Sequence, residues 1–300
     1  MSILANRALI LAVLTTNAGR AMAQSTPSAA FTTAGEGNET YVLISGMVGG
    51  VAGFQRLERL LLARGHRVIV IDPYRLSLDS ADVTFAAMAR RVDAILAAEG
   101  VVGALVVAHS QGAGVALRLA ATSPGRAAAL YLLDAGAQAA NHGPTLSVAV
   151  RLVPVLTRMP GGRGFVRTRF IRALHESSGH QEWLDTATVR AYTDPMLDGV
   201  DRVVAMACRL AHAEEPEALA VVVSRIHIPV TVLIGDAPHE TGAGPEELSA
   251  LRPLGTLLRV EHEPGVGHFI HEEVPNEVAR VLFDRRGSAV EQHLARAGEP

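Results

Sequence analysis

Residues 104–122 read ALVVAHSQGAGVALRLAAT, and the fold is predicted most directly from this stretch. A run of aliphatic residues leads straight into Ser110, and a helix rich in alanine and glycine follows without a linker. A serine on so tight a strand-to-helix turn needs small residues two positions before it and two after it, because larger side chains would collide. Ala108 and Gly112 meet this requirement, and Gly114 lets the helix pack closely on the sheet. The stretch therefore predicts a strand, a serine in a strained turn, and a helix.

The same alternation of strand and helix extends on both sides of this stretch. Short, nearly continuous apolar runs predict strands of a parallel sheet that is covered on both faces. The longer segments between them carry apolar residues at helical spacing. The predicted strands are Tyr41–Ser45, Arg67–Asp72, Ala104–Ala108, Ala128–Asp134, Pro229–Ile234 and Leu257–Glu261, and the predicted helices are Phe54–Arg64, Thr84–Ala98, Gln111–Thr122, Glu246–Leu251 and Asn276–Arg285. The pattern predicts an α/β fold with a mostly parallel, doubly wound sheet.

One interval, between Asp134 and Pro229, contains no convincing strand. It is too long for a loop, so we expect a helical cap inserted after the strand that ends at Asp134, lying above the end of the sheet where ligands bind. Four segments look helical, namely Leu146–Thr157, Gly164–Ser177, Thr186–Tyr192 and Asp198–Ala213, with breaks expected at Pro144, Pro154, Pro160 and Pro195. The predicted organisation is a core of residues 24–136 and 227–287, a cap of residues 137–226 and a C-terminal tail of residues 288–300.

The first 23 residues have the order of a signal peptide. Arg7 precedes a short apolar run, and Ala21-Met22-Ala23 offers a small-x-small cleavage site. The run is too short to span a bilayer, and no other segment approaches the length of a membrane span without a charge or a helix breaker. We therefore expect residues 1–23 to be removed and the protein to be exported, to the periplasm or beyond; without this signal it would be cytoplasmic.

Composition excludes several kinds of chemistry. The formal net charge is -3, so the chain lacks the basic footprint of a nucleic-acid-binding protein. All 27 basic residues are arginine, which excludes Schiff-base, pyridoxal phosphate and P-loop lysines. The lone cysteine, Cys208, permits no internal disulfide or cysteine-based metal cluster and is expected to fill space on a helix. The glycines after the first strand lack the dinucleotide-binding spacing, and the histidines lack a zinc-binding motif, so we expect no cofactor and no metal.

A serine hydroxyl is a weak nucleophile, so Ser110 needs a general base. The segment Gly265–Phe269 (GVGHF) follows the last predicted strand on a glycine-rich loop. From this loop His268 can reach the serine at the same end of the sheet, which makes it the predicted base. Other histidines near these segments, which would face away from the serine, are His109, His262 and His271.

Three motifs together resemble the α/β-hydrolase family, in its lidded serine esterase form, over roughly Tyr41 to Arg286. They are Ser45-Gly46-Met47 after the first strand, AHSQG around Ser110 and GVGHF around His268. The resemblance implies that the backbone N–H groups of Met47 and Gln111 form an oxyanion hole. Ser45 stands where the family usually has histidine, and the family's usual first pair of strands is shortened or missing.

The acid of the implied Ser-His-Asp triad departs from the family pattern. The family usually places it in the loop after the strand Pro229–Ile234, but the customary position here holds Pro238. Asp134, at the end of the preceding strand, and Asp236 are both within reach of the histidine loop, and Glu240 is a third candidate. Asp134 is the predicted acid, with Asp236 as the alternative.

The implied activity is hydrolysis of a small carboxylic ester or lactone through an acyl-enzyme intermediate. Two alternatives remain open at this point. One is a non-hydrolytic ligand-binding or sensory protein of the same fold, and the other is a carbon–carbon bond hydrolase or perhydrolase. An acid directed at His268 would favour an enzyme, and an acid pointing away from it would favour a binding protein.

Overall fold

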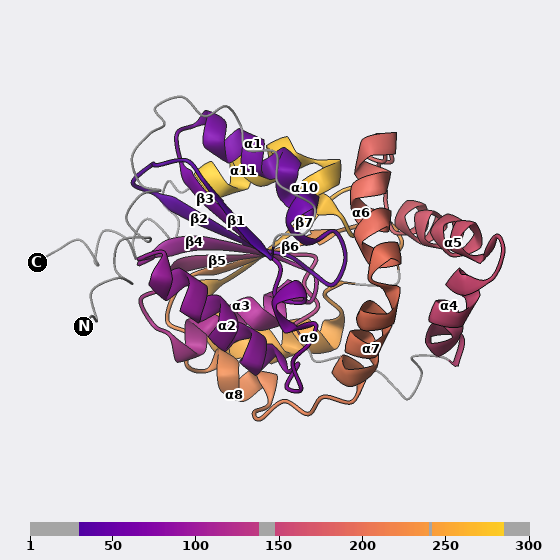
Figure 1. Cartoon of the computed structure of the whole chain (residues 1–300). Helices are drawn as coiled ribbons and strands as arrows, with labels where there is room; N and C mark the ends of the chain where they lie inside the picture. Colours follow the sequence, from indigo (N-terminus) through magenta and orange to yellow (C-terminus); the bar gives the residue numbers. More distant parts are fainter. Residues whose placement is uncertain (1–29, 138–147, 240–241, 285–300) are drawn as a thin grey trace, which may run out of the picture.

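The computed structural model describes residues 30–137, 148–239 and 242–284 (Figure 1). The predicted signal peptide (residues 1–23) and the predicted tail (residues 288–300) lie outside the described residues, as does the start of the predicted cap. Within the described part, no helix combines the length and the apolar character that crossing a bilayer requires.

A seven-stranded sheet runs through the centre of the described chain, with the strand order β1-β3-β2-β4-β5-β6-β7. Every neighbouring pair is parallel except β1 and β3. The strands are β1 (Phe31–Ala34), β2 (Thr40–Ile44), β3 (Arg67–Ile71), β4 (Ala104–His109), β5 (Ala127–Leu133), β6 (Val230–Gly235) and β7 (Leu258–Glu263). The prediction of a mostly parallel α/β sheet is confirmed, and the six predicted strands are β2 to β7. The short antiparallel edge strand β1 was not predicted.

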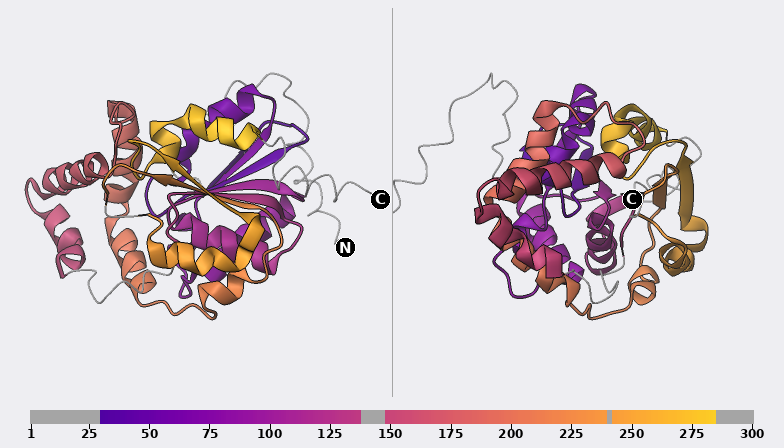
Figure 2. Two further views of the ribbon diagram at one scale, coloured as in Figure 1. Left: turned by 180° about the vertical axis from the view of Figure 1, so that it is seen from behind. Right: turned by 90° about the vertical axis from the view of Figure 1, so that its right-hand side faces the viewer.

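Helices cover both faces of the sheet because alternate strand residues point to opposite sides (Figures 1 and 2). Val42 and Ile44 belong to one buried apolar cluster, and Tyr41 and Leu43 belong to another on the opposite face. The first face carries α2 (Phe85–Ala98), α3 (Gly112–Thr122), α8 (Leu219–Val223) and α9 (Pro245–Leu251); the second carries α1 (Gln55–Ala63), α10 (Ile270–Glu273) and α11 (Pro275–Phe283). Short 3-10 helices are η1 (Gly50–Phe54), η2 (Arg75–Ser77) and η3 (Arg252–Leu257).

Four helices between β5 and β6 form the helical insertion that the sequence predicts, here called the cap. They are α4 (Val148–Arg158), α5 (Gly162–Glu176), α6 (Thr186–Asp198) and α7 (Val200–Ala211), and they lie together at one end of the sheet (Figure 1). Two predicted helix breaks are wrong, because Pro154 lies inside α4 and Pro195 inside α6. A proline removes one backbone hydrogen bond, and each helix continues past that loss.

Candidate active site

Ser110 sits on the tight turn between β4 and α3, in the left-handed conformation with φ 51°. Its backbone is held from both sides: its N–H donates to the Leu133 carbonyl at 2.9 Å, and its carbonyl accepts from the Gly136 N–H at 2.9 Å. Glycine fits closely opposite the turn, since a Cβ on Gly46 would lie 3.0 Å from the Ser110 Cβ and would crowd it. Such a strained backbone is typical of functional positions. The turn leaves the serine side chain partly exposed.

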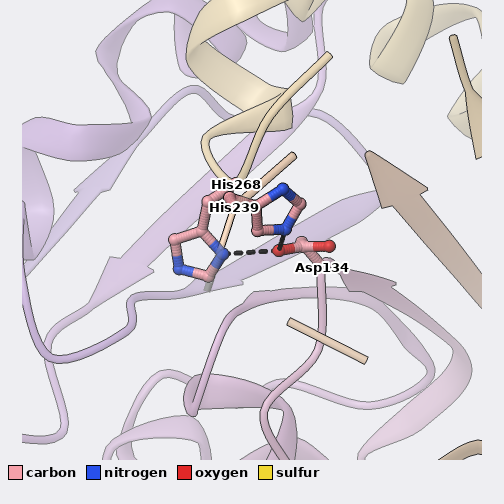
Figure 3. A group of neighbouring side chains, drawn as sticks. All are labelled: Asp134, His239 and His268. Atoms are coloured by element: carbon pink, nitrogen blue, oxygen red, sulfur yellow. Dashed lines mark hydrogen bonds and ion pairs between the residues drawn. The ribbon is translucent and has the colours of Figure 1, made fainter. Parts of the chain in front are cut away.

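Asp134, just after β5, is wholly buried and also has a positive φ, 42°. Its Oδ2 lies 2.5 Å from Nδ1 of His268 (Figure 3). The alternative acid, Asp236, makes no hydrogen bond to His268 among the described residues. Its Oδ1 lies 2.7 Å from Nδ1 of His262 in an exposed pair. Glu240, the third candidate, lies outside the described residues. Of the two acids that the structure describes, only Asp134 is brought to the predicted base.

His268 lies on the loop after β7 and is buried. The backbone N–H of His268 donates to the backbone carbonyl of Ser177 at 2.8 Å. The histidine loop therefore packs on the segment between cap helices α5 and α6. Glu273 strengthens this contact, because its carboxylate accepts from the N–H groups of Gly267, Gly179 and His180 at 2.7–3.1 Å. The cap therefore takes part in holding the predicted base. In the described structure Ser110 Oγ has no hydrogen bond to His268, a looser arrangement that is common before substrate binds.

The sequence analysis missed His239 as a member of this site. The side chain of His239 is 7% exposed, and its Nε2 lies 2.8 Å from the same Asp134 Oδ2 that contacts His268 (Figure 3). Its ring therefore occupies the loop after β6, where the family usually carries the acid. The available signal was the pair Pro238-His239 at that position.

Two further histidines, His109 and His271, pack next to the His268 loop, and burial favours their neutral form. The pKa of His109 lies well below its usual value because of burial and the nearby histidines His271 and His268, and burial lowers the pKa of His271 to about 3. His109 Nε2 donates to the His268 carbonyl at 2.9 Å, since a carbonyl can only accept. The ring of His271 packs against both Phe54 and His109 in tilted arrangements, with centroid distances of 4.6 and 4.3 Å. Both rings thus pack beneath the histidine loop.

The predicted oxyanion donors belong to different loops. Met47 follows β2 and is half exposed, and Gln111 is the N-cap residue of α3, directly after Ser110. Within the described chain, neither backbone N–H donates to another group. The Gln111 side chain is fixed by the buried Tyr74 hydroxyl, which donates to its Oε1 at 3.1 Å. Both amides therefore remain candidates for the predicted oxyanion hole.

The cap contacts the loop after β2 through an aromatic cluster that contains Tyr192, Trp183 and Phe269. Tyr192 lies so close to the loop after β2 that a Cβ on Gly49 or Gly53 would come within 2.9 Å of its ring or hydroxyl. The Tyr192 hydroxyl donates to the buried Glu272 at 3.1 Å. Residues of the cap and of the core therefore pack together against the loop after β2, which carries the predicted oxyanion donor Met47.

Asp134, His239 and His268 are also the group of described residues whose donor atoms are close enough for a metal ion, all within 4.8 Å of one another. The nitrogen–oxygen distances of 2.5 and 2.8 Å are those of hydrogen bonds, so these contacts account for the arrangement without a metal.

Residues 41–281 match the model of the alpha/beta hydrolase family. The chain belongs to this family. The hydrolase is 22% identical over 251 residues to an sn-1-specific diacylglycerol lipase of Mus musculus, an alignment that covers 79% of this chain and 77% of the mouse protein.

Solved structures share the fold of the hydrolase. A thermophilic esterase from Thermogutta terrifontis superposes with a TM-score of 0.62 at 21% identity, covering 84% of this chain and 90% of the esterase. A bacterial membrane phospholipase A superposes with a TM-score of 0.63 at 20% identity, covering 84% and 80% of the two chains. At these identities the likeness concerns the fold, and the chemistry of this hydrolase has to be argued from its own residues.

Proposed function

We propose that this hydrolase cleaves small carboxylic esters, or lactones, through an acyl-enzyme intermediate on Ser110. The observation that carries the proposal is the buried Asp134 carboxylate, 2.5 Å from His268 Nδ1, at the same end of the sheet as the strained Ser110 turn. In this reaction His268 takes the proton of the serine hydroxyl as its oxygen attacks the ester carbonyl. Asp134 orients the ring and stabilises the imidazolium that forms.

The negative charge that develops on the carbonyl oxygen needs donors. The N–H groups of Met47 and Gln111 are proposed to supply them, a contribution that is typically about 3 kcal/mol for each donor. His268 then returns its proton to the leaving alcohol, and water hydrolyses the acyl-enzyme by the same route. A serine nucleophile favours acyl transfer over the aspartate-based displacement that other reactions on this fold use.

An acid that points at His268 also weighs against the ligand-binding alternative, which an acid turned away would have favoured. Both the mouse relative, named as a lipase, and the Thermogutta protein, named as an esterase, are consistent with ester substrates. The aromatic cluster favours a small acyl group, because Trp183 of the cap packs on Phe269, and Phe269 in turn packs on the His268 ring at centroid distances of 5.0 and 5.1 Å.

The proposal is tested by labelling the purified protein with a serine-directed fluorophosphonate and mapping the adduct by mass spectrometry. We expect one adduct per chain on Ser110, and turnover of p-nitrophenyl acetate that the Ser110→Ala variant loses. Ser123→Ala, at the end of α3, is the matched control and should label like the unchanged protein. Labelling at another serine, or none together with no turnover, would remove the basis for the proposal.

A further inference from the structure

The ring of His239 has a hydrogen-bond acceptor at each of its two nitrogens. Nδ1 lies 2.7 Å from the carbonyl oxygen of Ala237, and Nε2 lies 2.8 Å from Asp134 Oδ2. A carbonyl oxygen cannot donate, so Nδ1 must carry a proton. A neutral imidazole has only that one proton, and its other nitrogen would then face the carboxylate lone pair to lone pair.

One additional proton must therefore lie between His239 and Asp134. Since a carboxyl group is ordinarily the stronger acid, the proton belongs on the imidazole. We infer that His239 is held as an imidazolium that shares the carboxylate of Asp134 with His268, and that it acts as a positioning residue which tunes the base. This inference rests on the proposed function, because it assigns His268 the role of base.

The surroundings of His239 are consistent with a held charge. The hydrogen bond to Asp134 raises the pKa of His239, and Glu273 adds to the rise in that pKa. The other titratable groups near the pair are the His268 ring, with a centroid distance of 5.9 Å, and the buried Glu247, whose carboxylate accepts from the Ala137 N–H at 2.6 Å. Of these groups, Glu273 is the carboxylate that favours the cation, and His268 is the base on which the cation acts.

The charge on His239 has a direct consequence for the base. Asp134 would otherwise offer its whole negative charge to protonated His268, which is the inactive form of the free enzyme. A second cation on the same oxygen makes a proton on His268 less favourable, so the base stays free at lower pH. The hydrolase should therefore keep its activity further into the mildly acidic range than an enzyme without His239.

The charge state can be read without any turnover. We would label the histidine rings with ¹⁵N and record their shifts at pH 7.5, assigning His239 by the signals that the His239→Gln variant loses. If that variant does not fold, His239→Asn provides the assignment. We expect both His239 nitrogens to show the shifts of an imidazolium; one protonated and one unprotonated nitrogen would overturn the inference. This readout is independent of catalysis, so it separates the inference from failure of the proposed function.

The effect on the base is measured by the pH profile of Ser110 labelling or of ester hydrolysis. In His239→Gln we expect the acidic limb to move up by about one pH unit, which is about a tenfold loss at low pH, because one charge near the base is removed. His262→Gln is the matched control: it makes the same substitution in an exposed histidine–aspartate pair and should leave the limb in place. An unmoved limb in His239→Gln would show that His239 is only structural.

Discussion

The backbone of Asp134 adopts a conformation that residues other than glycine rarely take, and it shares this feature with Ser110 alone among the described non-glycine residues. Both residues follow neighbouring parallel strands, where a turn directly after the last ladder hydrogen bond aims the side chain across the edge of the sheet. In this position the Asp134 carboxylate is completely buried. Its hydrogen bonds to two histidines offset the free-energy cost of that burial.

At this scale we predict that Asp134→Asn lowers kcat for p-nitrophenyl acetate by about 10³- to 10⁴-fold, because an amide no longer stabilises the imidazolium. The matched control is Asp236→Asn, which removes the alternative acid from its exposed pair with His262 and should keep kcat within about twofold. Steady-state kinetics at pH 8 compares the two. Loss of activity in Asp236→Asn alone would contradict the site described here.

The sequence limited the candidates for the triad acid to three residues, but its pattern alone could not show which of them contacts His268. Asp134 and Asp236 both follow strands that flank the histidine loop, and only the tertiary packing shows that Asp236 turns outward to His262. His239 was missed for a related reason. A histidine in a loop has no periodicity, and its role depends on a partner more than 100 residues away.

At the scale of elements, one carboxylate ties the end of the cap to the core. Glu215, just after α7, accepts from the N–H groups of Phe85 and Ala86 at the start of α2, at 2.5 and 3.2 Å. Its Oε2 also pairs with Nε of the buried Arg118 on α3 at 2.8 Å. A negative group at a helix N-terminus is stabilising, so the cap contributes to the stability of α2.

We predict that Glu215→Ala lowers the free energy of unfolding by about 3 kcal/mol, because it leaves Arg118 buried without its carboxylate partner. Glu217→Ala is the matched control, since Glu217 pairs with Arg225 in solvent and its removal should leave the urea midpoint unchanged. Equilibrium unfolding in urea, followed by circular dichroism, gives both values. Equal midpoints for the two variants would contradict the role assigned to Glu215.

The elements that the sequence predicted are those with a strong repeating pattern. Strands β2 to β6 read as continuous apolar runs because both faces of the sheet are covered. The missed elements are short or weakly patterned: β1 and α10 have four residues each, and α8 has five. Pro154 and Pro195 misled the prediction because local propensity was overridden by the packing of the cap.

At the scale of the whole molecule, buried acids and buried histidines have opposite effects on how the free energy of unfolding changes with pH. Burial raises the pKa values of Glu247 and Glu272 to about 7, from 4.5. Their protonated forms are favoured in the folded state, so stability is lost as pH rises from 4.5 through 7. Burial lowers the pKa of His271 from 6.5 to about 3, so stability is lost as pH falls through that range.

We therefore predict that these three groups together give most stability near pH 4.5 to 5, because above that pH the loss from Glu247 and Glu272 outweighs the gain from His271. In His271→Gln the decline on the acidic side should be shallower, because this variant no longer has to bury a neutral imidazole that the unfolded chain would protonate. The exposed His227 gives the control His227→Gln, whose acidic decline should match that of the unchanged protein. Urea unfolding at half-unit pH steps measures these slopes, and identical slopes in the two variants would contradict the prediction.

The junction between cap and histidine loop also limits how this enzyme can diverge. Ser177 binds the loop of His268 directly, and the Glu273 carboxylate joins Gly179 to Gly267 of that loop, so the cap is not an interchangeable module. A chimera that replaced all four cap helices with another lid would also displace His268, the proposed base, unless it kept residues 177–180 in place. Replacing the cap therefore requires that this junction is carried over as one piece.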